Sequence, residues 1–309
     1  MTSSEKIIKQ FPLIIIPKPL RITHNYFFSF VYYKVSMKIF YFIAVTFTFS
    51  LTAFAQKKAD TLFFDDFKGN ALNRAEWNYE ITGNTTNNEQ QAYIDSNITL
   101  SIADGVLAIT PVYHQGYEST KHIKYDFLST RINTRSKFEF TYGTASARIK
   151  MSGGAGLWPA FWMLGEGKWP DCGEIDIMET VGDSTWISNA MHGPGYFGNT
   201  PFAYRDHFPK GIDVTQWHTY TVNWTKDSVI FSVDGAVTYT VTRAMVEHYG
   251  RWAFDNPKFL LLNFAIGGGY PNGVNKISSP YFGLSQSSVD KIKLGQAKML
   301  VDWVLVTKE

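Results

Sequence analysis

Segments in which apolar and polar residues alternate recur along much of the chain beyond residue 60. The clearest are 218–224, 229–233 and 236–241, which are separated by polar residues at 226–227 and 234–235. Successive side chains of a β-strand point to opposite faces, so this alternation is typical of strands with one buried face. The polar pairs between the segments are typical of tight turns. We therefore predict three consecutive strands in this part of the chain.

Two further strand pairs are expected nearer the start of this region. Segments 98–102 and 106–109 flank Asp104-Gly105, a dipeptide that favours a β-hairpin turn. Segments 137–140 and 145–151 have the same alternation and are predicted to form a second pair.

The last third of the chain continues the pattern, with predicted strands at 258–265 and 298–307. Long amphipathic helices are scarce, and only 244–248 is expected to form a short helical turn. Many short strands joined by polar turns indicate an all-β protein in which two sheets pack into a sandwich.

One predicted strand carries an unusual acidic run, with Glu174, Asp176 and Glu179 set among apolar, β-branched residues. Ionised side chains in a buried strand are costly unless they are paired or functional. Glu174 and Asp176 share a face by alternation, whereas Glu179 should face the other way. One extra residue, a β-bulge at or near Met178, would return Glu179 to the face of the other two.

Paired carboxylates in a cleft are the groups that glycoside hydrolysis requires. One attacks the sugar or activates water, and the other, with a raised pKa, protonates the leaving oxygen. A solvated strand face that is acidic by chance is the structural alternative. A divalent metal site fits less well, because the run offers three oxygen ligands and no histidine at helical or zinc-type spacing.

The neighbouring residues extend this pattern. Gly-Leu-Trp-Pro-Ala-Phe-Trp begins at 156, Trp169-Pro170 follows, and the acidic run has the form E-x-D-x-x-E. Together these motifs closely resemble glycoside hydrolase family 16, and within it the laminarinase-like β-1,3-glucanases, whose signature usually has this bulged form. The resemblance covers most of the chain after residue 60. It implies a β-jelly-roll with a substrate cleft across its concave sheet.

The resemblance also implies roles for the three carboxylates. Glu174 matches the nucleophile and Glu179 the general acid/base, while Asp176 between them would tune the charge of the nucleophile. The implied mechanism retains the anomeric configuration, which requires the two working carboxyl groups to lie about 5–5.5 Å apart.

Substrate-binding residues are implied in the same way. Trp158 and Trp162 share one strand face by alternation, and Trp162 and Trp169 match tryptophans that border the glycone side of the laminarinase cleft. His192 stands where the family has a cleft histidine near the acid/base. Weaker matches are Asn88, which resembles an asparagine that reaches the substrate, and Arg131, which resembles an arginine of an outer glycone subsite. For each of them a purely structural role is the alternative.

Catalysis is expected to need no cofactor, although the family often binds a structural calcium on its convex face. Asp66, Gly105 and Asp302 match the positions of its ligands. Oxygen ligands from distant strands suit a hard cation and would tie the two ends of the domain together.

One departure from the family pattern concerns the motif Y-G-[RK]-x-E-A-R. Thr144 and Ser146 stand here where relatives often carry two charged residues. If the usual glutamate supports the catalytic acids, rate or subsite preference would differ in this chain.

The start of the chain resembles an export signal. Residues 37–55 combine a charged start, an apolar run and an A-x-A pattern, so we expect a secretory signal cleaved after Ala55. Residues 1–36 are then interpreted as a mis-annotated extension, and 56–309 as a single hydrolase domain. The apolar run is shorter than the roughly 20 residues of a membrane span. A secreted or periplasmic location is therefore expected.

Removing this leader changes the charge of the protein. The chain has a formal net charge of +2, but residues 56–309 contain 23 basic and 26 acidic residues, a net charge of −3. A negative net charge gives no reason to expect a nucleic-acid partner. The single cysteine, Cys172, excludes an intrachain disulfide and is expected to be a small buried filler. The high aromatic content, 16%, suits both a sandwich core and sugar-binding platforms.

The leading hypothesis is a secreted, monomeric endo-hydrolase of β-1,3-glucan that also accepts mixed-linked β-1,3-1,4-glucan. One alternative keeps the mechanism but changes the substrate to a galactan of the agarose or carrageenan type, because cleft loops decide specificity. A transglycosylase is another version of the same chemistry. A non-catalytic glucan-binding protein is the alternative from a different functional class.

Overall fold

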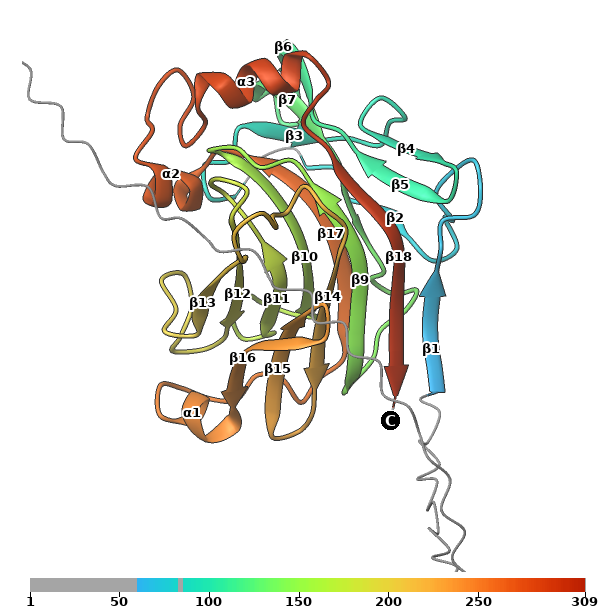
Figure 1. The fold of residues 1–309 in the computed structure, drawn as a ribbon, viewed down its shortest axis with the longest axis vertical. Helices are drawn as coiled ribbons and strands as arrows, with labels where there is room; N and C mark the ends of the chain where they lie inside the picture. Colours follow the sequence, from blue (N-terminus) through green and yellow to red (C-terminus); the bar gives the residue numbers. More distant parts are fainter. Residues whose placement is uncertain (1–59, 83–85, 309) are drawn as a thin grey trace, which may run out of the picture. The chain divides into compact units, whose positions relative to one another are not determined.

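Two antiparallel sheets packed face to face form most of the molecule (Figure 1). The computed structural model describes residues 60–82 and 86–308. The expected leader, residues 1–36 and 37–55, lies outside the described residues. Among the described residues, no helix is long and apolar enough to cross a membrane.

The first sheet has eight strands in the order β16-β15-β14-β9-β18-β5-β4, with β1 pairing against β18. These strands are β1 (Asp60–Asp65), β4 (Leu100–Ala103), β5 (Val106–Ile109), β9 (Gly143–Met151), β14 (His218–Trp224), β15 (Ser228–Val233), β16 (Ala236–Thr242) and β18 (Met299–Lys308).

The second sheet has seven strands in the order β13-β12-β11-β10-β17-β8-β2, and it contains the acidic run. These strands are β2 (Asn78–Tyr79), β8 (Arg131–Asn133), β10 (Leu157–Gly165), β11 (Glu174–Glu179), β12 (Trp186–His192), β13 (Ala203–His207) and β17 (Lys258–Ile266).

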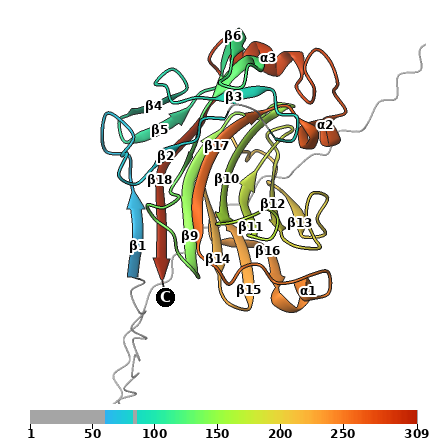
Figure 2. The same ribbon diagram turned by 180° about the vertical axis from the view of Figure 1, so that it is seen from behind.

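A smaller sheet and three short helices complete the described part of the chain. The sheet contains β3 (Gln91–Tyr93), β7 (Lys124–Ser129) and β6 (Val112–Glu118). The helices are α1 (Arg243–Glu247), α2 (Gly269–Asn275) and α3 (Gln286–Lys293). Figure 2 shows α2 and α3 at the end of the sandwich opposite α1. The element order and the two large sheets confirm the predicted jelly-roll sandwich.

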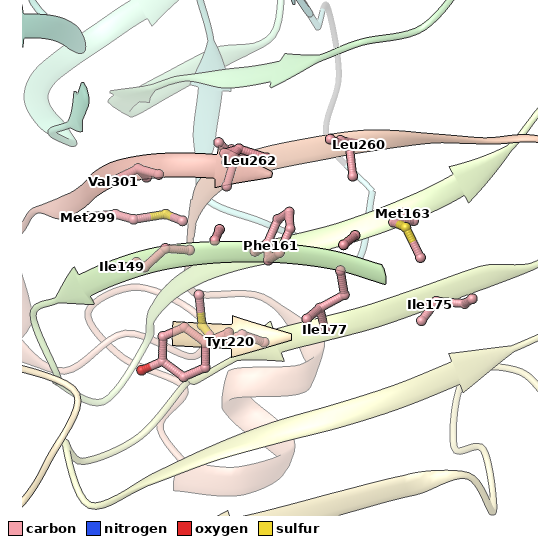
Figure 3. Packing of buried hydrophobic residues seen from close by; sticks show 14 of the residues in the cluster. Ile149, Phe161, Met163, Ile175, Ile177, Tyr220, Leu260, Leu262, Met299 and Val301 are labelled. Carbon is pink, nitrogen blue, oxygen red and sulfur yellow. The ribbon is translucent and has the colours of Figure 1, made fainter. Parts of the chain in front are cut away.

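The core lies between the two sheets and is built by the alternation seen in the sequence (Figure 3). Ile149 and Tyr220 of the first sheet face the second, whose Phe161 and Ile175 face the first, and all four are fully buried. Burying one side chain of this size stabilises the fold by about 1.5–3 kcal/mol. The acidic strand is therefore anchored from behind by its apolar residues.

The sequence predicted most of the strands but was wrong about 137–140. This segment does not pair with β9, whose partners are β14 and β18. Instead the backbone N–H groups of Lys137 and Phe138 both donate to the carbonyl of Thr134, which closes a turn. Only Phe140 makes an isolated bridge, to Lys258. The aromatic alternation here reflects packing against the core by a turn, which a period-two pattern does not exclude.

The helices α2 and α3 were not predicted, because both are short. α2 begins after Gly268, whose φ of 100° favours glycine, and a Cβ there would lie 2.8 Å from the carbonyl oxygen of Asn87. α3 is capped by Ser285, whose side chain accepts from the backbone N–H of Ser288. Such glycine- and serine-rich stretches are equally typical of loops.

The departure at Thr144 and Ser146 lies far from the acidic run in the fold. Both residues are on β9, in the sheet opposite β11. Their hydroxyls bond to Asn223 and Thr221 on the neighbouring strand β14, at 2.9 Å in each case. The interpretation that the missing charges change the support of the catalytic acids is therefore wrong, since the core separates the two positions.

Candidate active site

A bulge in β11 places the three carboxylates on one face. On the neighbouring strand β10, Trp162 pairs with Asp176, whereas Ala160 pairs with Glu179. Two residues of β10 thus match three of β11, and β12 shows the same shift between Asp176 and Glu179. The extra residue restores Glu179 to the face of Asp176, as the spacing of the motif predicted.

The same face of β10 presents two tryptophans to the carboxylates. Trp158, Ala160 and Trp162 alternate with buried core residues, and all three line one cleft. Because Ala160 is small and lies opposite Glu179, the strand leaves space above the acid. The expected sharing of one strand face is therefore confirmed.

Two indoles hold the outer carboxylates by hydrogen bonds. Trp158 Nε1 donates to Glu179 Oε1 at 2.7 Å, and Trp169 Nε1 donates to Glu174 Oε2 at 2.9 Å. Each hydrogen bond orients a carboxyl group and uses only one of its two oxygens. Trp169 is itself 43% exposed, so it can also present its ring to a ligand.

His192 reaches the carboxylates from the other neighbouring strand. It pairs directly with Glu174 across β11 and β12. Its Nε2 lies 3.3 Å from Asp176 Oδ2 and 4.0 Å from Glu174 Oε1. Strand pairing thus brings a histidine to the acidic run, 13 positions after Glu179, at the position where the family resemblance implied a cleft histidine.

The surroundings raise the pKa of all three carboxyl groups. Burial, followed by the charge of Asp176, raises the pKa of Glu179 to about 8, and the Trp158 hydrogen bond opposes this. Burial and the Asp176 charge also raise the pKa of Glu174, while the positive charge of His192 lowers it. Burial raises the pKa of Asp176, and its hydrogen bond with Glu174 lowers it. Glu174 and Asp176, as a buried hydrogen-bonded pair, are best described as sharing one proton.

A cleft of about 340 Å³ lies over the acidic face. Its lining combines tryptophan rings with a few polar groups, as expected for a small-ligand site. The lining residues are Thr86, Asn87, Glu89, Arg131, Trp158, Ala160, Trp162, Leu164, Trp169, Glu174, Glu179, Asn263 and Ala265.

The fold and this site can be compared with known proteins. The model of the family described as glycosyl hydrolases family 16 matches residues 107–272, more than half of the chain. The chain belongs to glycosyl hydrolase family 16. Its two packed sheets form the jelly-roll fold of that family.

Individual relatives agree with this assignment. The laminarinase catalytic domain of Thermotoga maritima MSB8 superimposes with a TM-score of 0.71 at 31% identity, covering 81% of this chain and 98% of that one. Glucan endo-1,3-beta-glucosidase A1 of Niallia circulans is 32% identical over 79% of this chain. A keratan-sulfate endo-1,4-beta-galactosidase of Sphingobacterium multivorum is 29% identical over 74%. The chain spans 37% of the length of the Niallia circulans protein and 54% of the length of the Sphingobacterium multivorum protein.

Arg131 lies at the far end of the cleft of this family 16 hydrolase, on β8. Its Nη1 donates to Glu80 Oε1 at 3.0 Å, and its guanidinium lies 4.5 Å from the ring centre of Tyr93 and 5.6 Å from that of Trp162. These contacts hold a buried cation against the aromatic floor of the cleft.

Asn263, Tyr93 and Glu89 support Trp162 and were not identified as site residues from the sequence. Trp162 Nε1 donates to Asn263 Oδ1 at 2.7 Å, and Asn263 Nδ2 donates to the Tyr93 hydroxyl at 3.2 Å. That hydroxyl in turn donates to Glu89 Oε2 at 3.4 Å. The chain of hydrogen bonds orients the indole, and an asparagine in the apolar run 259–266 of β17 is the signal that could have revealed it.

The structure corrects the position of the expected substrate asparagine. Asn87 lines the cleft, whereas Asn88 lines a second pocket together with the first residues of β7. Both residues have positive φ, 54° and 56°, so the backbone turns sharply here. A sharp turn sends neighbouring side chains in different directions, which the resemblance of the Asn-Glu pair alone did not show.

Tyr270 is a further cleft residue that the sequence did not indicate. It lies at the start of α2, packs edge-to-face on Trp158 with ring centres 5.5 Å apart, and shares a 3.0 Å hydrogen bond with Ser188. Ser188 pairs with Glu179 across β11 and β12. Tyr270 therefore closes the Glu179 end of the site.

Lys258 holds the loop that leads into β11. Its Nζ, fully buried, donates to the carbonyls of Cys172 and Ala253 at 2.9 and 3.1 Å and to Asn256 Oδ1 at 2.7 Å. Burial lowers the pKa of Lys258 to about 7. Gly173 packs so closely that a Cβ would lie 2.1 Å from Ala253 O. Cys172 is buried, and its carbonyl is part of this anchor two residues before β11.

The expected calcium ligands lie around β18. Val304 of β18 pairs with Asp65, next to Asp66, and Val301 pairs with Leu107, near Gly105. However, the Asp66 carboxylate binds Lys68 at 2.6 Å and the Asp302 carboxylate binds Arg148 at 2.5 Å. The backbone positions suit a shared ion, but these carboxylates are directed to basic side chains, so calcium here stays a prediction.

Proposed function

We propose that the protein is an endo-acting hydrolase of β-1,3-glucan, including mixed-linked β-1,3-1,4-glucan, and that it retains the anomeric configuration. The observation that supports this most directly is the bulge of β11. It sets Glu174 and Glu179 on one face, opposite Leu164 and Ala160 of β10, with Asp176 between them. Two carboxylates at the floor of an aromatic cleft match the needs of the double-displacement reaction.

In the first step, Glu174 attacks the anomeric carbon from below while Glu179 donates its proton to the leaving glycosidic oxygen. Glu174 must be ionised for this step, and the Trp169 hydrogen bond and the charge of His192 both favour its ionised form. The raised pKa of Glu179 keeps it protonated near neutral pH. The glycosyl group is then bound covalently to Glu174.

In the second step, Glu179, now ionised, removes a proton from water, and that water displaces Glu174 from the sugar. Asp176 is proposed to hold the shared proton while Glu174 is the leaving group. Because Asp176 is hydrogen-bonded to Glu174, it can stabilise the returning negative charge without contacting the sugar itself.

The aromatic lining supports a neutral polysaccharide as the substrate. Trp162 and Trp169 offer flat apolar surfaces for pyranose rings, and Arg131 and Asn263 offer hydrogen bonds at the glycone end. The names of the first relative and of the structural neighbour, a glucan endo-1,3-beta-glucosidase and a laminarinase, point to the same substrate.

The first experiment is the release of reducing ends from laminarin by residues 56–309, beside mixed-linkage glucan, agarose and carrageenan. We expect cleavage of laminarin that is lost in Glu174→Gln, a change that keeps the shape of the side chain and its contact with Trp169. Retention of the configuration would be read by NMR of the first product formed. Binding of laminarin without cleavage by the wild-type protein would favour the glucan-binding alternative.

A galactan is the second candidate substrate, because one relative is a keratan-sulfate endo-1,4-beta-galactosidase. Arg205 on β13 pairs with Ser188 beside the acid/base and is exposed, so a cation is available to an anionic galactan at this point. Cleavage of agarose, carrageenan or keratan sulfate with no cleavage of laminarin would show that the substrate is a galactan. The proposed roles of Glu174 and Glu179 would remain the same.

We further propose that the enzyme is exported, in keeping with a polymeric substrate that cannot enter a cell. The support is the signal-like run at 37–55. Mass spectrometry of the mature protein from culture medium should find Gln56 as the first residue. A peptide from residues 1–36 would contradict both the cleavage and the interpretation of that extension.

A further inference from the structure

Phe197 forms an exposed aromatic surface beside the catalytic carboxylates. It lies between β12 and β13, is 51% exposed, and meets Trp169 edge-to-face with ring centres 5.3 Å apart. Trp169 in turn donates its hydrogen bond to Glu174. Neighbouring apolar rings that stay exposed at a cleft mark a binding surface more often than scattered surface residues do.

The position of Phe197 differs from that of the other cleft aromatics. The 340 Å³ cleft lies over β8, β17 and β10, on one side of β11. Phe197 follows β12, which pairs with the opposite edge of β11. An endo-acting enzyme must hold sugar units on both sides of the bond that it cleaves. The side of the site next to β12 and β13 is therefore available for the part of the sugar chain that is released.

The floor on that side is made of small residues. Ala190 lies opposite Asp176 on β12, on the same face as His192, and it pairs with the exposed Ala203 on β13. Phe197 stands beyond His192 at one end of this floor, and Tyr270 bonds to Ser188 at the other. Two alanines between aromatic walls leave room for a ring lying across the strands.

The loop that carries Phe197 is firmly held. Tyr196 is 1% exposed, and its hydroxyl donates to the carbonyl of Arg251 at 2.9 Å. Gly193 and Tyr196 exchange two backbone hydrogen bonds of 3.0 Å. Gly195, with a φ of 94°, packs against Tyr249 so closely that a Cβ would lie 2.5 Å from its carbonyl oxygen. The wall is thus formed in advance and needs no ordering when a ligand binds.

We propose that Phe197 forms the wall of a leaving-group subsite that binds the reducing-end side of the glucan and, after it departs, an acceptor sugar. This inference rests on the proposed glucanase function. Phe197 would then influence how the glycosyl-enzyme partitions between hydrolysis by water and transfer to an acceptor sugar. It assigns Phe197 no part in the attack by Glu174 or in proton transfer by Glu179.

The test measures that partition directly. The protein is incubated with laminarin and added laminaribiose, and transfer and hydrolysis products are separated by chromatography and identified by mass. Phe197→Ala should lower the ratio of transfer to hydrolysis about threefold to tenfold, the effect of losing one aromatic contact. Phe197→Tyr should restore most of it. Phe64→Ala is the matched control, because Phe64 is also 51% exposed but lies on β1 of the other sheet.

A second measurement is independent of turnover. Calorimetry of laminarihexaose binding to Glu174→Gln should show affinity falling by a similar factor when Phe197→Ala is added, and no change when Phe64→Ala is added. Equal partition and equal affinity with and without the Phe197 ring would overturn the inference even if laminarin is cleaved. A wild-type protein that cleaves no laminarin would instead contradict the proposed function, and the binding arm would still decide the role of Phe197.

Discussion

The indole N–H of Trp158 donates a 2.7 Å hydrogen bond to Glu179, the carboxyl group proposed as acid/base. The bond stabilises the ionised carboxylate, so it opposes the rise in pKa that burial and Asp176 cause. Trp158 therefore has two roles. It lines the cleft with its ring, and it sets how readily Glu179 gives up its proton.

Trp158→Phe should raise the pKa of Glu179 further, because the ring is retained and only the donor is lost. The general acid must be protonated, so activity is present below its pKa and is lost as pH rises through it. The alkaline limb of kcat/KM should therefore move to higher pH, with a lower maximum because the carboxyl group is less well oriented. A profile of unchanged position would show that the indole N–H does not influence Glu179.

His192→Asn should affect the opposite limb. The positive charge of His192 lowers the pKa of Glu174, so removing it raises that pKa. A nucleophile must be ionised, which means that activity is lost as pH falls through its pKa. We expect the acidic limb of kcat/KM to move to higher pH while the alkaline limb moves less. His248→Asn, on the turn after α1, is the matched control and should leave both limbs in place.

Deleting Ile177 tests the bulge itself. In the present register two residues separate Asp176 from Glu179, while one residue of β10 separates their partners Trp162 and Ala160. Without Ile177 the strand would alternate regularly and Glu179 would still face the cleft opposite Ala160. We expect the variant to lose about 2–5 kcal/mol of stability from its missing core side chain but to retain measurable activity.

The control for that deletion is removal of both Ile177 and Met178. Glu179 would then follow Asp176 directly, so alternation should turn Glu179 to the core face and reduce activity to the level of Glu179→Gln, a loss of about 10²–10⁴-fold for a general acid. Circular dichroism would establish that each variant is folded before rates are compared. Loss of activity in the single deletion together with full activity in the double deletion would contradict the assigned register.

Gly173→Ala should be strongly destabilising for two reasons. The φ of 72° disfavours an alanine, and its Cβ would meet the Ala253 carbonyl that Lys258 holds. We expect thermal unfolding to reveal a loss of about 1–3 kcal/mol or more, and kcat to fall because Glu174 is the next residue. Gly167→Ala provides the comparison, since its φ of 110° is also positive but nothing lies within 4 Å of its Cβ.

The residues that could be identified from the sequence are those whose chemistry is expressed locally. Glu174, Asp176 and Glu179 stand out because three acids in a β-branched strand are improbable without a purpose, and their spacing already required a bulge. The tryptophans of β10 follow from simple alternation. The short helical turn expected at 244–248 is confirmed by α1, whereas α2, α3 and the turn at 137–140 were missed because their glycine, serine and aromatic residues fit several local structures.

Sequence alone therefore determined the all-β class, the acidic face and the two tryptophans beside it, because period-two alternation and a motif of six residues are local properties. Only the tertiary structure decided which distant residues join them. Strand pairing places His192 opposite Glu174, and a sharp turn selects Asn87 over Asn88 for the cleft. The stretch that follows β12 brings Phe197 against Trp169. These relationships depend on which strands become neighbours, a choice made by burial of the whole core.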